Sequence, residues 1–62
     1  MPTSERALVQ QRVRDCDTKI RAQRAIIESM QANGRDAENA LNVLSALEAS
    51  QALRLRRLRA IG

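Results

Sequence analysis

The chain has 62 residues, a formal net charge of +4, one cysteine, no histidine and no aromatic residue. A single cysteine excludes an intramolecular disulfide, and one cysteine among scattered carboxylates does not supply the ligands of a zinc site. A chain of this length forms one domain at most, over residues 1–62, and a domain of this size is only marginally stable alone. We therefore expect its stability to come from helix packing across a subunit interface.

The apolar residues are aliphatic and stand beside many Arg, Gln and Glu, a composition typical of a long helix or coiled coil. No apolar run approaches the roughly 20 residues that span a bilayer. The opening residues MPTSER lead into no apolar core of the kind that a signal peptide requires. We expect no membrane association and a cytoplasmic location, where an unpaired cysteine stays reduced.

A first helix is predicted over about residues 4–32. Its apolar positions recur in alternating steps of four and three, which defines a heptad seam. Thr3 or Ser4 is the expected N-cap, with Glu5 in the first turn where the helix dipole favours an anion. The seam has Arg6, Val13, Ile20 and Ile27 at position a, and Val9, Cys16, Gln23 and Met30 at position d. Ile26 widens this stripe at position g.

A turn is predicted at residues 33–36 and a second helix over about residues 37–60. Gly34 is expected in the left-handed conformation that closes a helix, and Asp36 is expected to cap the next one. Asn33-Gly34 would also suit a strand hairpin, but the flanking sequence has the period of helices. The broad apolar face of the second helix consists of Ala37, Ala40, Leu41, Leu44, Leu47, Gln51, Leu55, Leu58 and Ile61.

The short connection predicts an all-α antiparallel two-helix hairpin. If the chain reverses symmetrically about Gly34, facing residues have numbers that sum to about 68, so Val13 meets Leu55 and Cys16 meets Gln51. Two helices leave half of each apolar stripe exposed to solvent, which favours a homodimeric four-helix bundle. The predicted oligomer core consists of Val9, Val13, Cys16, Ile20, Ile27, Leu44, Leu47, Leu55 and Leu58.

Cys16, Gln23 and Gln51 are candidate functional residues within the seam. Cys16 lies between Asp15 and Asp17 with no histidine as a base, so a buried core thiol is favoured over a nucleophile. Gln23 and Gln51 interrupt the apolar seam, and a role in fixing register is favoured over a polar ligand groove. No pair of carboxylates is placed for acid–base work and no Gly-rich phosphate loop exists. The sequence predicts no catalytic, cofactor-binding or metal site, and no enzyme.

Arginines gather at the end of the predicted hairpin that carries the termini. The whole formal charge of +4 lies in residues 1–17 and 51–62. Such a cluster suits nucleic-acid phosphates or an acidic partner, but a solvated, dipole-matching helix end is the alternative. Without aromatic residues to stack on bases, any nucleic-acid binding should be weak. The possible contacts are Arg12, Arg14, Arg54, Arg56, Arg57 and Arg59.

The segments IRAQRAIIE at 20–28, GRD at 34–36, Leu44 and LEAS at 47–50 resemble a family of short helical-hairpin proteins of rhizobia and related alphaproteobacteria. The resemblance covers about residues 15–58 and implies the hairpin fold, without an assigned activity. Gln51 stands where that family has an aliphatic residue. By architecture alone, the chain is also similar to a plasmid-encoded RNA-binding hairpin dimer, an analogy that carries no function.

Two classes of function follow. The first is a non-enzymatic module for self-association or for docking another protein helix. The second is a nucleic-acid-binding regulator that uses the arginine-rich end. Salt dependence separates them, because phosphate binding weakens steeply with salt and apolar docking does not.

Overall fold

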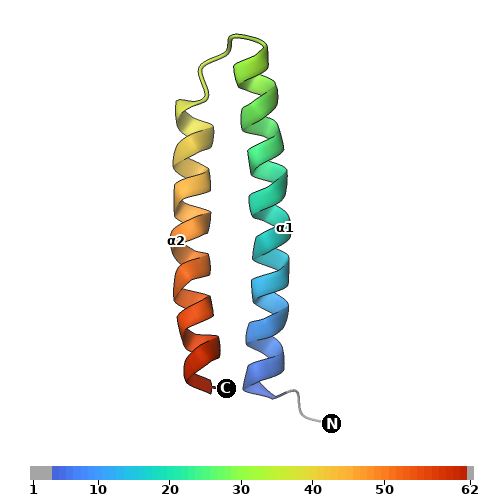
Figure 1. Ribbon diagram of the computed structural model, residues 1–62, viewed down its shortest axis with the longest axis vertical. Helices are drawn as coiled ribbons and strands as arrows, with labels where there is room; N and C mark the ends of the chain where they lie inside the picture. The colour runs from blue at the N-terminus through green and yellow to red at the C-terminus, as the bar shows by residue number, and fades with distance from the viewer. Residues whose placement is uncertain (1–3, 62) are drawn as a thin grey trace.

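Two helices make up the computed structural model, which describes residues 4–61. Helix α1 spans Glu5–Ala32 and helix α2 spans Glu38–Ile61. They run side by side in opposite directions, so the start of α1 and the end of α2 lie at the same end of the hairpin (Figure 1). The predicted all-α antiparallel hairpin is therefore confirmed, while its pairing into a four-helix bundle stays a prediction.

The start of α1 is capped by Ser4. Its backbone is extended, and its side-chain oxygen accepts a hydrogen bond of 3.1 Å from the Ala7 amide. This bond satisfies one of the amides that has no partner at a helix N-terminus. Glu5 adds a carboxylate to the first turn, where the helix dipole favours it. Of the two predicted caps, Ser4 is confirmed, and Thr3 lies outside the described residues.

The end of α1 is closed by Gly34, which has a φ of 69° as predicted. The Gly34 amide donates to the Gln31 carbonyl at 3.1 Å, and the Arg35 amide donates to the Met30 carbonyl at 2.8 Å. These two bonds form a Schellman motif, which satisfies the last carbonyls of the helix and needs a left-handed residue at its centre. Glycine adopts that conformation without strain.

The start of α2 differs by one residue from the prediction. The Leu41 amide donates to the Ala37 carbonyl at 2.8 Å, so Ala37 rather than Asp36 holds the cap position. Asp36 lies one residue earlier, and its Oδ1 accepts from the Glu38 amide at 3.0 Å. Ala37 is buried against α1. A carboxylate in its place would lose its water, which explains why the aspartate stands outside the helix.

The core is the seam between the two helices. From α1 it contains the buried residues Val9, Cys16, Ile20 and Ile27. The facing side chains of α2 are only half-buried, and among its described residues none is fully buried. These facing positions are Ala40, Leu44, Leu47, Gln51, Arg54, Leu58 and Ile61. Their alternating steps of four and three give α2 the same heptad geometry as α1.

The register of the two helices differs from the prediction by about five residues, which is more than one helical turn. Cys16 Sγ donates to the Leu47 carbonyl at 3.7 Å, and Gln23 Nε2 donates to the Ala40 carbonyl at 3.0 Å. Facing residues therefore have numbers that sum to about 63, and the predicted sum of 68 is wrong. After Gly34 the linker runs back beside α1 before α2 begins, so the reversal is not symmetric (Figure 1).

The hairpin is a single layer of helices. Its principal extents are 49 × 20 × 13 Å, and the shortest is close to the diameter of one helix. Its radius of gyration is 14.7 Å, whereas a compact domain of this length has about 10.6 Å. Both broad faces are therefore open to solvent. In the described part of the chain, neither helix has a stretch long and apolar enough to cross a membrane.

Candidate interaction surface

The seam divides the hairpin into two faces, which we name after one leucine on each. On α1, the Leu8 face carries positions c and g of the heptad, and the Leu55 face carries positions b and e. The Leu8 face consists of Glu5, Leu8, Arg12, Asp15, Lys19, Ala22, Ile26, Val43, Ala46, Ser50, Leu53 and Arg57. The Leu55 face consists of Arg14, Asp17, Thr18, Arg21, Arg24, Leu41, Glu48, Ala52 and Leu55.

Exposed apolar side chains are concentrated on the Leu8 face. Leu8, Ile26, Val43 and Leu53 are 44–64% exposed. Residues that are three, four or seven positions apart lie on the same side of a helix. Ile26 therefore shares a side of α1 with Lys19, and Val43 and Leu53 share a side of α2 with Ser50. The Leu55 face has only Leu41 and Leu55, at 43% and 39%. The Leu8 face is thus the larger apolar surface without a partner in this chain.

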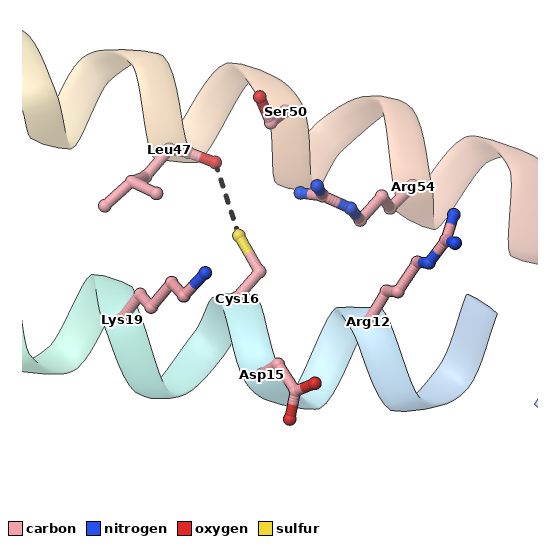
Figure 2. Close-up of a pocket in the computed structure, with 7 residues that line it drawn as sticks. All are labelled: Arg12, Asp15, Cys16, Lys19, Leu47, Ser50 and Arg54. Carbon is pink, nitrogen blue, oxygen red and sulfur yellow. Dashed lines mark hydrogen bonds between the residues drawn. The ribbon is translucent and has the colours of Figure 1, made fainter. Parts of the chain in front are cut away.

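A groove of about 280 Å³ crosses the middle of the Leu8 face. Cys16 lies at its floor, and the side chains of Arg12, Lys19 and Arg54 surround it (Figure 2). The Arg54 guanidinium extends along α2 toward Ser50, whereas that of Arg12 reaches up toward α2, so the two do not meet. The Asp15 carboxylate points away from α2. Among the described residues, the ion pairs include none with Arg12, Asp15, Lys19 or Arg54.

The six arginines predicted to contact anions are spread around the hairpin. Arg12 and Arg54 line the groove of the Leu8 face. Arg57 lies beside them but is paired with the Glu5 carboxylate across the two helices. Arg14 lies on the opposite, Leu55 face. Arg56 and Arg59 are exposed and line neither of these grooves. The fold therefore does not assemble one arginine surface.

The Leu55 face has a wider groove of about 530 Å³, lined by Val13, Arg14, Asp17, Thr18, Gln51 and Leu55. Four charged side chains on this face are paired within the chain, Arg21 with Asp17 at 3.0 Å and Arg24 with Glu48 at 3.2 Å, whereas Arg14 has no ion pair among the described residues. Gln51 Nε2 donates to the Val13 carbonyl at 2.9 Å, but its Oε1 is buried without a hydrogen-bond partner.

Both seam glutamines bind the backbone of the opposite helix. Gln51 reaches the Val13 carbonyl and Gln23 reaches the Ala40 carbonyl. Each bond requires one donor and one acceptor at matching heights, so a slip of α2 along α1 would break both. This arrangement agrees with the predicted role of these residues in fixing register.

Most residues of the predicted oligomer core lie in the seam of the single hairpin. Val9, Cys16, Ile20 and Ile27 are buried there, and Val13, Leu44, Leu47 and Leu58 are half-buried. Leu55 lies outside the seam, because the observed register places Arg54 at the seam position opposite Val9. The prediction that Val13 meets Leu55 across the seam is wrong, since Gln51 is the residue that contacts Val13.

Sequence reasoning missed the apolar members of the Leu8 face other than Ile26. Leu8, Val43 and Leu53 lie one step outside the a and d positions, and a search for the strongest stripe passes over them. The signal was present as a second set of aliphatic residues at c and g positions. This second set can be recognised only when Arg54, and not Leu55, is known to be a seam residue.

The predicted buried thiol is confirmed, since Cys16 is 5% exposed and donates to a backbone carbonyl. Within residues 4–61, no three histidine, cysteine or carboxylate side chains lie close enough together to hold a metal ion.

The comparisons with known proteins find nothing similar. No protein-family model, no curated protein and no solved structure matches the chain. The resemblance to the rhizobial hairpin proteins therefore stays a prediction.

Proposed function

We propose that this chain is a non-enzymatic self-association module that pairs with a second copy to form a four-helix bundle. A single layer of two helices has no second layer against which to bury its apolar surface, and stable domains have at least two. A second hairpin supplies that layer. The proposed setting is the cytoplasm, in keeping with a lone reduced thiol.

The amount of exposed surface carries the proposal. The chain exposes 4956 Å² of accessible surface. A compact monomer of the same mass, 6.9 kDa, exposes about 4000 Å². The excess of about 1000 Å² is close to the roughly 800 Å² that each partner buries in a stable protein interface of standard size. One interface with a partner of similar size would therefore bring the surface of the chain into the normal range.

A second copy fits this requirement better than an extended ligand. The hairpin is 49 Å long and 20 Å wide, so a rigid partner of equal length covers a whole face at once. Pairing between identical hairpins also needs no ordering of a disordered segment, which would weaken binding. The exposed aliphatic residues on the Leu8 face identify the surface that a second hairpin would cover.

Nucleic-acid binding is the alternative, and the geometry gives it less support. The six arginines lie on several sides of the hairpin. The guanidinium groups of Arg12 and Arg54, which line the same groove, point in different directions (Figure 2). Arg57 is already neutralised by Glu5. Any binding to duplex RNA or DNA should then be weak and should fall steeply with salt.

Sedimentation equilibrium at micromolar concentrations tests the proposal. We expect a mass of about two chains and a melting temperature that rises with protein concentration, because association stabilises only the folded state. A monomer whose melting temperature is independent of concentration would refute the proposal.

Two double variants identify the face. Leu8→Ser with Ile26→Ser removes exposed apolar side chains from the Leu8 face, and we expect it to weaken dimerisation at least tenfold. Leu41→Ser with Leu55→Ser is the matched control on the other face, and we expect it to leave the dimerisation constant within about threefold. The reverse ranking would place the interface on the Leu55 face.

A further inference from the structure

We infer that two copies pair through their Leu8 faces with α1 against α1 of the second copy, antiparallel, so that Asp15 of each chain meets Lys19 of the other. This inference rests on the proposed self-association and adds the orientation and the register. It follows from the spacing and the chemistry of the α1 residues on the Leu8 face.

The α1 stripe of this face reads the same in both directions. Its positions 8, 12, 15, 19, 22 and 26 are separated by four, three, four, three and four residues. A two-fold axis perpendicular to the helix brings each position onto another member of the stripe. With the axis at the height of position 17, Leu8 meets Ile26, Arg12 meets Ala22 and Asp15 meets Lys19.

Chemistry selects this register among those that the spacing allows. Shifting the axis toward the N-terminus by half a heptad sets Arg12 against Asp15, but it also sets Leu8 against Lys19 and leaves Ile26 uncovered. Shifting the axis by the same step in the other direction sets Asp15 against Ile26. The central register alone pairs the apolar ends with each other and the unpaired carboxylate with an unpaired ammonium group.

The orientation is selected by like charges. If the two-fold axis ran along the helices instead, α1 would face α2 of the second copy at equal height. Arg12 and Arg54 lie at similar heights in the hairpin and line the same groove. That orientation would therefore bring the two arginines together twice per dimer. In the antiparallel orientation, Arg12 faces Ala22 and its guanidinium can reach water at the edge.

The middle of the interface can be closely packed. In the register of the hairpin, the α2 residue at the height of position 17 is Ala46, so α2 would cross α2 of the second copy at a small side chain. Ser50 lies four residues further on the same face. Small residues at a crossing point let two helices approach closely, which lets the flanking Val43 and Leu53 reach the second chain.

Disulfide trapping tests the orientation. In a Cys16→Ser background, the double variant Leu8→Cys and Ile26→Cys is oxidised with oxidised glutathione, which accepts the two electrons as each pair of thiols becomes a disulfide. We expect covalent dimers on a non-reducing gel. Within one helix the two positions are about 27 Å apart, so no disulfide can form inside a chain.

The single variants are the controls. With Leu8→Cys alone or Ile26→Cys alone, the antiparallel dimer keeps the two thiols about 27 Å apart, so little covalent dimer should form. Efficient cross-linking by Leu8→Cys alone would overturn the inferred orientation. A non-covalent dimer that none of the variants cross-links would overturn the choice of face. A monomer in sedimentation would instead refute the self-association itself, so the two failures are distinguishable.

Charge reversal tests the register. Asp15→Lys sets two ammonium groups against each other at two symmetric places, and we expect dimerisation to weaken about tenfold. Asp15→Lys combined with Lys19→Asp restores opposite charges at both places, and we expect recovery to within about threefold of the starting value. Glu28→Lys makes the same charge change on an exposed position outside the Leu8 face and serves as the control. Failure of the double variant to recover would overturn the register.

Discussion

The two faces of the hairpin have similar numbers of charged side chains but use them differently. On the Leu55 face, Arg21 pairs with Asp17 and Arg24 pairs with Glu48 inside the chain. On the Leu8 face, the Glu5–Arg57 pair lies near the chain ends, while Asp15 and Lys19 have no ion pair among the described residues. Most of the charged side chains that we assign to the Leu55 face are paired inside the chain, and this face has fewer exposed aliphatic residues. This difference supports the proposed division, in which the Leu55 face meets water and the Leu8 face meets a second copy.

The largest effect is expected at the seam, on which both faces depend. Ile20→Asp places a carboxylate at a position that is 6% exposed. The charge would lose its water without gaining a partner, at a cost on the order of 3 kcal/mol or more. We expect circular dichroism to show loss of helicity. Thr18→Asp adds the same carboxylate at an exposed position of α1, and it should leave the spectrum unchanged. If Ile20→Asp melts like the unmodified chain, the seam is not the core.

The turn should show the next largest effect. Gly34→Ala adds a Cβ with no atom within 4 Å, so its cost is backbone strain alone. At a φ of 69° that cost is about 1 kcal/mol, or roughly 4–8 °C in melting temperature for a domain of this size. Gly34→Asn should cost less, because asparagine adopts the left-handed region more readily. Equal melting temperatures for all three chains would contradict the Schellman closure.

The seam glutamines give a smaller effect, which compares two hydrogen bonds across the seam. Gln51→Leu removes an Oε1 that is buried without a partner on the Leu55 side, together with one hydrogen bond to a carbonyl. An unsatisfied buried acceptor costs about as much free energy as the hydrogen bond contributes. We therefore expect the free energy of unfolding to stay within about 1 kcal/mol of that of the unmodified chain, or to rise. Gln23→Leu loses the hydrogen bond to the Ala40 carbonyl and removes no buried atom that lacks a partner, so we expect it to be the less stable of the two variants. Urea denaturation of both variants measures the order.

The smallest effects concern the exposed charges and separate the two faces most cleanly. Glu48→Gln breaks an ion pair whose side chains are about half exposed, which should lower the free energy of unfolding by at most about 0.5 kcal/mol. Asp15→Asn breaks no ion pair within the chain and should leave the unfolding of the hairpin unchanged, while weakening dimerisation. Denaturation at low concentration and sedimentation at high concentration measure the two quantities. A loss of hairpin stability with Asp15→Asn would contradict the proposed division between the faces.

The helices and the turn could be predicted because they depend on local chemistry. The heptad steps from Val9 to Met30 define one face of α1. Gly34 marks the end of α1, because glycine is the residue that most readily adopts the left-handed conformation that closes a helix. The register could not be predicted from these signals. It depends on how far residues 35–37 run back along α1, which is decided by the Schellman bonds and by the burial of Ala37 together. With the register wrong by about five residues, Leu55 was assigned to the seam in place of Arg54, and the exposed aliphatic residues of the Leu8 face other than Ile26 were not recognised.

The position of Cys16 allows the native thiol to report how accessible the seam is to solvent. The thiol is the only one in the chain, and it is buried at mid-height in the seam, bonded to the Leu47 carbonyl. Because Cys16 is only 5% exposed, at the floor of the groove on the Leu8 face, we expect a thiol reagent to reach it faster when that groove is uncovered or when α1 and α2 separate. Without any substitution in the chain, that rate would report how far the thiol becomes protected as the protein concentration rises and a second copy covers the groove.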